Sequence, residues 1–486
     1  MARLRLWIGA STADACVRLA AQTLTTIVVA RLLPAETFGV ALMILSVVAV
    51  FSAFIGLPLE ESLAQRQRLT LGHVQSALFV SLMLTVAVLV VVLAASPTLA
   101  RVTGVPEIAL WLPVATLFLV GEGPGAIVRA LARRHRRFVA LAVSQSAGVV
   151  VASAVAIAAV DSGYGIAALI LQRMLPVVLL PLVALALATG KPGRTPVVRP
   201  AWHPARFREL FRFSWLHLSD VGVGAATPAV AAYMINGTFG TAMLGQLNIA
   251  LRIVDPLRQL IGGIGHNLVF SLLYRMQDDP ARLSVAAAQS VVNVGVLAVP
   301  AFLGLAVCSP LLLPLLAGPG WEAAIPLSRA LCLGAAVYVP FGFLYSGFSA
   351  MGRPELGLAG SCLRLAVIVA GLGLIAFAGT DGGIGSVMAA GDVAVSGFAV
   401  ALLLGYAGAG AGEALGKVAR LWAAALVMAI VLDLFVAGIG AAGPPVLELA
   451  LIILSGALLY PILLLGFCPS CAGALRDRVF SRREIE

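Results

Sequence analysis

The sequence predicts an all-α polytopic membrane protein. Of its 486 residues, 61% are hydrophobic and only 11% are charged, and the mean hydropathy is +1.04. An average soluble domain is about 45–50% apolar and about 25% charged, so a water-soluble chain of this size could not bury so much apolar surface. The apolar residues also form runs of the length that crosses a bilayer as a helix, roughly 20 residues. Lipid is therefore the predicted solvent for most of the chain.

About fourteen membrane-spanning helices are expected, joined by short connections. The turns expected between neighbours include Leu33-Pro34-Ala35-Glu36 and Asn236-Gly237-Thr238. By length and hydropathy the spans fall near residues 8–31, 37–57, 74–96, 108–130, 138–160, 163–188, 211–235, 240–274, 284–316, 322–349, 355–378, 383–406, 416–438 and 444–467.

Basic residues indicate how the chain is oriented in the membrane. They gather in every second connection, for example in Arg133-Arg134-His135-Arg136-Arg137, whereas the opposite loops hold only Arg101, with Arg31 at a boundary. Short cytoplasmic loops carry such an excess of Lys and Arg. Both termini are therefore predicted to be cytoplasmic. Topology also explains the formal charge of +10, so no nucleic-acid partner is expected.

The helices are predicted to form two six-helix lobes followed by two C-terminal helices. Lys191–Pro200 is rich in Pro and basic residues and has the composition of a linker. Thr37–Ala41 and Thr238–Ala242 form a short internal repeat, and six helices per lobe relate the lobes by a pseudo-twofold along the membrane normal. The predicted regions are an N-lobe at 1–189, a basic cytoplasmic linker at 190–209, a C-lobe at 210–407, and the last two helices with a cytoplasmic tail at 408–486.

Motifs for catalysis or cofactor binding do not appear in the sequence. Gly412–Lys417 has the wrong spacing for a phosphate-binding loop, and there is no nucleophile elbow or metal cluster. The lone Cys468-Pro-Ser-Cys471 pair cannot complete a four-ligand zinc site. The chain is therefore predicted not to be an enzyme, and no cofactor is expected.

The informative residues are arginines inside apolar runs. Each would cost about 2.5–3.5 kcal/mol at the bilayer centre if it faced lipid, so most must face a polar interior, a partner or the membrane surface. These arginines are Arg18, Arg173, Arg252, Arg258, Arg329 and Arg364.

Two interpretations of these arginines stay open. Asp14 lies four residues before Arg18, and Asp255 lies three residues from Arg252 and from Arg258, so local pairing on one helix would account for them. Arg173 and Arg364 have no acidic neighbour on their own helix, which favours a cavity role.

A cavity with surplus guanidinium groups suits an anionic, phosphate-bearing substrate. The candidate substrate-binding cations are Arg18, Arg173, Arg252, Arg258 and Arg364. A carboxylate in such a cavity is suited to bind a coupling proton or sodium ion, and the candidates are Asp14, Asp220 and Asp255.

Three stretches carry a resemblance to a known family. Ala-Arg-Leu-Leu-Pro-Ala-Glu-Thr-Phe-Gly at 30–39 resembles the signature after the first helix of bacterial oligosaccharide flippases, the polysaccharide transporters of the multidrug/oligosaccharidyl-lipid/polysaccharide flippase superfamily. Gly56–Glu60 with Gln65-Arg66 is similar to the family's second cytoplasmic connection. Leu251–Ser271 with Gln277–Asp279 resembles its eighth helix and the loop that follows. The sequence is most similar to members that serve exopolysaccharides such as succinoglycan.

The resemblance implies a flippase that works by alternating access through a cationic central cavity. Its cargo would be a polyprenyl-diphosphate-linked oligosaccharide, moved to the outer leaflet of the bacterial cytoplasmic (inner) membrane for polysaccharide biosynthesis. Implied partners are this lipid-linked substrate, membrane lipids, and the polysaccharide polymerase and export machinery. The alternatives are a cation-coupled multidrug antiporter of the same superfamily and, less favoured because the outer loops are short, a membrane glycosyltransferase or ligase.

Overall fold

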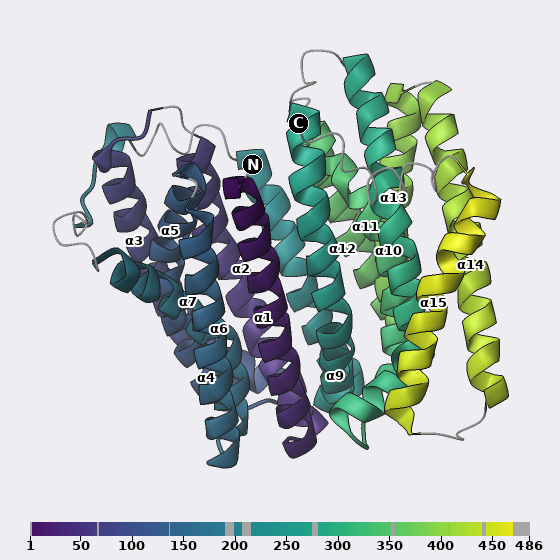
Figure 1. Cartoon of the computed structure of the whole chain (residues 1–486). Helices are drawn as coiled ribbons and strands as arrows, with labels where there is room; N and C mark the ends of the chain where they lie inside the picture. Colours follow the sequence, from purple (N-terminus) through teal and green to yellow (C-terminus); the bar gives the residue numbers. More distant parts are fainter. Residues whose placement is uncertain are drawn as a thin grey trace. The chain divides into compact units, whose positions relative to one another are not determined.

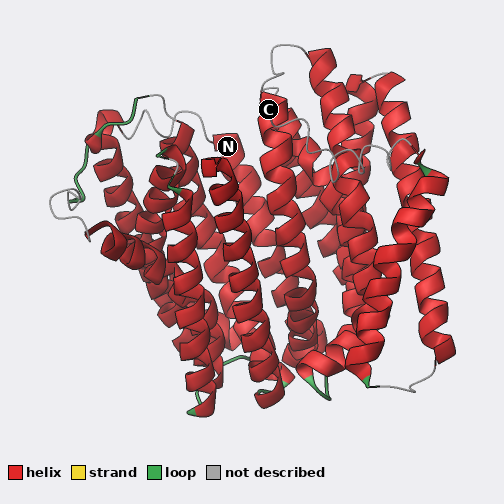
Figure 2. Ribbon diagram, viewed as in Figure 1, coloured by secondary structure: helices red, strands yellow, loops and turns green. Residues whose placement is uncertain are grey.

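The computed structural model is helical, and no strand occurs in the part of the chain that it describes (Figures 1 and 2). Only helices and closed barrels satisfy all backbone hydrogen bonds in lipid, so long helices are what the apolar runs dictate. Much of the predicted linker and of the basic tail lies outside the residues that the structure describes. The residues left undescribed are 1, 66–67, 136, 190–198, 207–214, 275–279, 351–352, 354, 381, 408, 440–443 and 470–486.

The chain divides into two compact units, Met1–Asn248 and Ile249–Glu486. The division falls inside helix α9, Trp215–Tyr274, so the first part of this helix packs with the N-terminal unit. The lobes predicted from the linker and the repeat have other boundaries, and they stay a prediction.

The N-terminal unit is an all-helical bundle. Within it, α6 packs against α1 and α7, and α2 packs against α5. A core of small and branched side chains between α2, α3 and α5 includes Leu63, Ala77 and Ala130. Before α9 its helices are α1 (Ala2–Leu32), α2 (Ala35–Gln65), α3 (Leu71–Thr103), α4 (Glu107–Leu117), the 3₁₀ turn η1 (Phe118–Gly121), α5 (Glu122–Arg134), α6 (Phe138–Asp161) and α7 (Gly165–Thr189).

The C-terminal unit continues from α9 with long apolar helices. Here α11 packs against α10 and α13, α12 packs against α13, and α14 packs against α10 and α15. Exposed apolar side chains such as Phe377, Leu434 and Leu458 provide the surface that lipid would cover. The helices are α10 (Pro280–Ala317), α11 (Ala324–Ala350), α12 (Glu355–Ala378), α13 (Ile384–Ala407), α14 (Ala409–Ile439) and α15 (Pro445–Phe467).

The described residues contain 13 helical segments long and apolar enough to cross a membrane. One of them, Leu218–Gly262 in α9, has 45 residues, about twice the length of one crossing. Gly240 breaks α9 into two helices with φ 82° and ψ 173°, a conformation essentially restricted to glycine. With α9 counted as two spans, the expectation of about fourteen helices is confirmed.

The predicted turn at Asn236-Gly237-Thr238 is wrong in position, because these residues are helical and the break comes at Gly240. The polar side chains in this stretch serve the helices instead. The buried Asn236 amide donates from Nδ2 to the Thr103 carbonyl at the end of α3, at 3.2 Å. Thr238 Oγ1 donates to the Met234 carbonyl one turn earlier, at 3.0 Å.

A glycine pair brings the beginning of α2 against α9 just after its break. A Cβ atom at Gly39 would collide with the carbonyl oxygen of Thr241, and one at Gly245 would collide with the carbonyl oxygen of Ala35. Asn248 Nδ2 donates to the Phe38 carbonyl at 2.8 Å beside this contact. We call this contact of Ala35 and Gly39 with Thr241 and Gly245 the glycine seam.

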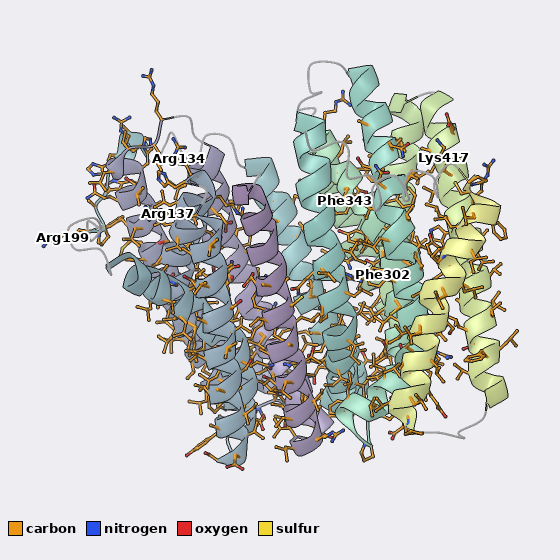
Figure 3. The ribbon with its side chains drawn as sticks, viewed as in Figure 1. Arg134, Arg137, Arg199, Phe302, Phe343 and Lys417 are labelled. Atoms are coloured by element: carbon orange, nitrogen blue, oxygen red, sulfur yellow. The ribbon has the colours of Figure 1, made fainter. Side chains whose placement is uncertain are left out.

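Basic side chains gather at one end of the N-terminal bundle. Figure 3 shows Arg134, Arg137 and Arg199 at the end where α1 begins. Arg137 and Arg199 are exposed there. This is the distribution on which the cytoplasmic side was predicted, and the side itself remains a prediction.

Candidate anion-binding site

Asp392 is the centre of a charged site within the C-terminal unit. It lies on α13 and is only 1% exposed. Gly334 of α11 leaves the room for it, because a Cβ atom at that glycine would lie 3.1 Å from Asp392 Oδ2. A carboxylate buried this deeply among apolar helices is stable only with cationic or hydrogen-bonding partners.

Two arginines from different helices supply those partners. Arg364 of α12 places Nη2 2.7 Å from Asp392 Oδ1, and Arg258 of α9 places Nη2 3.3 Å from Oδ2. The Arg364 guanidinium also lies over the ring of Tyr338 from α11, 5.3 Å from the ring centroid. Residues from α9, α11, α12 and α13 therefore meet at one carboxylate.

The arginines of this site have the geometry to bind an anionic ligand. Asp392 is one carboxylate shared by two guanidinium groups, and Asp255 adds a second carboxylate 3.9 Å from Arg258. The Nε atoms of Arg258 and Arg364 are buried and make no hydrogen bond in the described structure. A guanidinium has five N–H donors in a planar fork that matches a phosphate or carboxylate group, and the side chains of both arginines are partly exposed.

The other candidate residues of this unit lie close to the site along α9. Asp255 Oδ1 is 3.9 Å from Arg258 Nη1, and its side chain is 43% exposed, so the local pair expected from the sequence is a loose one. Arg252 is half-buried on the same helix. Of the predicted cations in this unit, the structure therefore brings Arg258 and Arg364 together.

Within the N-terminal unit, Asp14 and Arg18 form a local ion pair on α1. Arg18 Nη2 lies 2.9 Å from Asp14 Oδ2, and Ser146 of α6 donates to Asp14 Oδ1 at 2.6 Å. Asp14 is buried, whereas the Arg18 side chain is 37% exposed. The pairing interpretation therefore accounts for Asp14, while the guanidinium of Arg18 keeps an open edge.

Arg173 on α7 is exposed and has no hydrogen bond or ion pair to any described residue. Its position near the middle of an apolar helix makes that exposure costly in lipid, so a polar surrounding is required. Asp220, near the beginning of α9, is half-buried. Arg329, which was not chosen as a binding cation, pairs with Asp433 of α14 at 3.3 Å.

A second charged cluster of the N-terminal unit was not foreseen from the sequence. Arg129 Nε lies 2.6 Å from Glu60 Oε2, and its Nη2 lies 3.5 Å from Glu122 Oε2. Arg133 Nη1 completes the cluster at 2.8 Å from Glu60 Oε1, and Ser52 donates to Glu122. Two acids against two bases leave this cluster neutral, so it suits a structural connection between α2 and α5 better than an anion site.

The many membrane-length helices, with a charged site buried among them, define a multi-pass membrane protein. A family profile described as "Polysaccharide biosynthesis protein" matches residues 28–326, and the chain belongs to that family.

Named relatives agree with this family. The succinoglycan biosynthesis transport protein ExoT of Rhizobium meliloti is 24% identical over 363 residues, covering 74% of this chain and 71% of the relative. The lipopolysaccharide biosynthesis protein WzxC of Escherichia coli is 23% identical over 314 residues, covering 63% of this chain and 61% of the relative. The second match therefore spans slightly less than two thirds of the relative's length.

Solved structures show the same fold. Lipid II flippase MurJ in an inward closed conformation matches with a TM-score of 0.72 and 11% identity, covering 98% of this chain and 99% of the other. An inward-facing multidrug resistance MATE transporter of the MOP superfamily matches with a TM-score of 0.57 and 16% identity, covering 84% and 98%. The predicted all-α membrane fold is therefore confirmed, and it is the fold of these two transporters.

Proposed function

We propose that the chain is a flippase for a polyprenyl-diphosphate-linked oligosaccharide. It moves this substrate from the inner to the outer leaflet of the cytoplasmic membrane by alternating access, for exopolysaccharide or surface polysaccharide biosynthesis. The observation that carries the proposal is the convergence of Arg258 and Arg364 on the buried Asp392 in a member of the polysaccharide biosynthesis family. Relatives named for succinoglycan transport and for lipopolysaccharide biosynthesis support it.

The chemistry of such a substrate matches the arginines. A diphosphate offers several anionic oxygens that planar guanidinium groups bind in pairs, whereas the polyprenyl tail is stable in lipid and the sugars need water. Arg258 and Arg364 are assigned here to the diphosphate. Arg18, Arg173 and Arg252 complete the proposed set of cations that the polar end of the substrate meets.

Orientation and energy supply belong to the same proposal. Both termini lie on the cytoplasmic side, as the positive-inside distribution of Arg and Lys indicates. A proton or sodium ion bound at Asp14, Asp220 or Asp255 couples transport to an ion gradient. The polysaccharide polymerase and export machinery receive the translocated substrate.

The test is deletion of the gene in its source bacterium, followed by complementation with variants. Loss of surface polysaccharide, with the lipid-linked unit accumulating in the inner leaflet, is expected. The intact gene restores export, whereas Arg258→Gln and Arg364→Gln do not. Arg329→Gln is the matched control, because it removes an arginine whose partner Asp433 lies elsewhere in the same unit. Full export by both test variants at normal protein levels would contradict the site assignment.

A cation-coupled multidrug antiporter is the second candidate, favoured by the likeness in fold to MATE transporters. Such a pump for cationic drugs needs exposed carboxylates in place of surplus guanidinium groups. Normal polysaccharide with raised drug accumulation in the deletion strain would support it over the flippase.

A further inference from the structure

The anion site has a buried carboxylate and two arginines that are partly exposed. Asp392 is buried, whereas the side chains of Arg258 and Arg364 are 22% and 26% exposed. Each arginine contacts Asp392 through one terminal nitrogen. Neither therefore makes the bidentate interaction that a guanidinium can make with a phosphate or carboxylate. The carboxylate therefore lies on the buried side of both arginines, whose side chains each keep an exposed part.

Close packing holds this arrangement in place. A Cβ atom at Gly391 would lie 3.4 Å from Arg364 Cγ, and one at Gly334 would lie 3.1 Å from Asp392 Oδ2. Ser396 Oγ donates to the Asp392 backbone carbonyl at 2.8 Å and leaves its carboxylate to the arginines. Asp392 is thus a negative charge held in place next to two partly exposed cations.

We propose that Asp392 is a built-in counter-ion that weakens the binding of a phosphate-bearing ligand to Arg258 and Arg364, so that the ligand can be released. The inference rests on the proposed function, which supplies the anionic substrate. Charges a few ångströms apart in a partly buried site interact much more strongly than in water, so a fixed carboxylate opposes an incoming anion. Two arginines without it would capture a diphosphate tightly and release it slowly, which stops a transport cycle.

The first test is inorganic pyrophosphate titrated onto the purified full-length protein, with binding followed by calorimetry. Asp392→Asn keeps the shape of the side chain and removes its charge, and we expect pyrophosphate affinity to rise about tenfold or more. Asp392→Glu keeps the charge and should bind like the wild type. Adding Arg364→Gln to Asp392→Asn should abolish the gain. Asp433→Asn, which neutralises a carboxylate paired with Arg329, is the control for overall charge and should leave affinity unchanged.

A gain in affinity separates this role from a structural one, because a damaged site binds less. Unchanged or weaker pyrophosphate binding by monodisperse Asp392→Asn protein would overturn the proposal, and so would an absence of binding by wild type and variant alike. The second readout is export in complemented cells, where Asp392→Asn should be slower than the wild type although it binds more tightly. The deletion phenotype tests the flippase proposal and does not depend on pyrophosphate binding. The two proposals can therefore fail independently of each other.

Discussion

Asp14 and Asp392 show two ways in which an apolar helix holds a buried carboxylate. Asp14 finds Arg18 one turn further along its own helix, so the pair exists as soon as α1 forms. Asp392 is paired with arginines from α9 and α12, so its charge is compensated only when the helices of the C-terminal unit have packed. Removing one partner from such a buried pair leaves an uncompensated charge and is strongly destabilising.

Arg173 is expected to matter for transport and not for folding. It is exposed and has no partner in the described structure, so Arg173→Gln should change the free energy of unfolding by less than about 0.5 kcal/mol. Export in complemented cells should fall because a cation that meets the substrate is lost. Arg101→Gln is the control, since Arg101 is also exposed and, among the described residues, hydrogen-bonds to Pro97 and Thr98 of its own helix. Equal export by the two variants would contradict a substrate role for Arg173.

Glu60 is expected to matter for folding. Its carboxylate is buried and pairs with both Arg129 and Arg133, so Glu60→Gln leaves two guanidinium groups without their main acceptor. A loss of about 1–3 kcal/mol in stability is expected. Thermal unfolding of the detergent-solubilised protein, followed by size-exclusion chromatography, measures it. Glu107→Gln at the exposed beginning of α4 should melt like the wild type.

Sequence spacing could predict the local pairs and not the distant ones. Asp14 and Arg18 are four residues apart, which places them on one face of a helix. Asp392 and Arg364 are on the separate helices α13 and α12, so sequence spacing does not predict their contact. Counted from the loop that connects these helices, Asp392 is also fewer residues away than Arg364, so their expected depths in the membrane differ. The same reason hid the Glu60–Arg129 pair, whose members are separated by 69 positions in the chain.

At the scale of helices, hydropathy predicts where a span lies better than where its backbone breaks. The spans follow from the length and composition of apolar runs. The break in α9 was expected at Asn236-Gly237-Thr238 because those residues favour turns. Their side chains instead hydrogen-bond to the ends and turns of helices, and the break moved to Gly240. The 3₁₀ turn η1 likewise interrupts an apolar run whose composition gives no sign of it.

Gly240 and Gly237 provide a matched test of the break. Neither would bring an added Cβ atom within 4 Å of another group, so only the backbone conformation differs. Gly240→Ala forces alanine into a conformation that costs about 1–3 kcal/mol. Gly237→Ala lies in regular helix and should be neutral or stabilising, by up to about 1 kcal/mol. In thermal unfolding of the purified variants, Gly240→Ala should lose stability and Gly237→Ala should not, and equal loss by both would contradict the assigned break.

At the scale of the whole molecule, the glycine seam joins two helices that the sequence assigns to different lobes. The whole seam lies within the compact unit Met1–Asn248, and we expect the proposed alternating access to shift it between a closed and an open form. Gly245→Ala would drive a methyl group into the Ala35 carbonyl and should favour the open form. Gly224→Ala is the control, because a Cβ atom there meets nothing within 4 Å.

Cysteine accessibility measures this shift. A cysteine introduced at Thr241, in a protein whose native cysteines have been replaced, is labelled with a membrane-impermeant maleimide in intact cells. Gly245→Ala should increase the labelling rate and Gly224→Ala should not. A seam that stays equally closed in both variants would contradict its role as a gate.

The overall architecture could be predicted because it depends on features that can be counted along the sequence. These are the length of the apolar runs, the charge of the loops and the number of helices. The glycine seam could not be predicted in this way. The five-residue repeat aligns Gly39 with Gly240, whereas in the structure it is Gly39 and Gly245 that each pack against the backbone of the other helix. Which glycine lies against the backbone of another helix depends on how the helices pack. Amino-acid composition alone does not identify that glycine.

The glycine seam also bears on the electrical insulation of the membrane. Where Gly39 and Gly245 bring two backbones into contact, there is no room for a water molecule between the helices at that point. Protons travel along chains of water molecules, and a bacterium that moves a bulky hydrated sugar through its membrane must do so without dissipating its proton gradient. A closed contact of this kind lets a protein combine a wide polar path with a membrane that stays impermeable to protons.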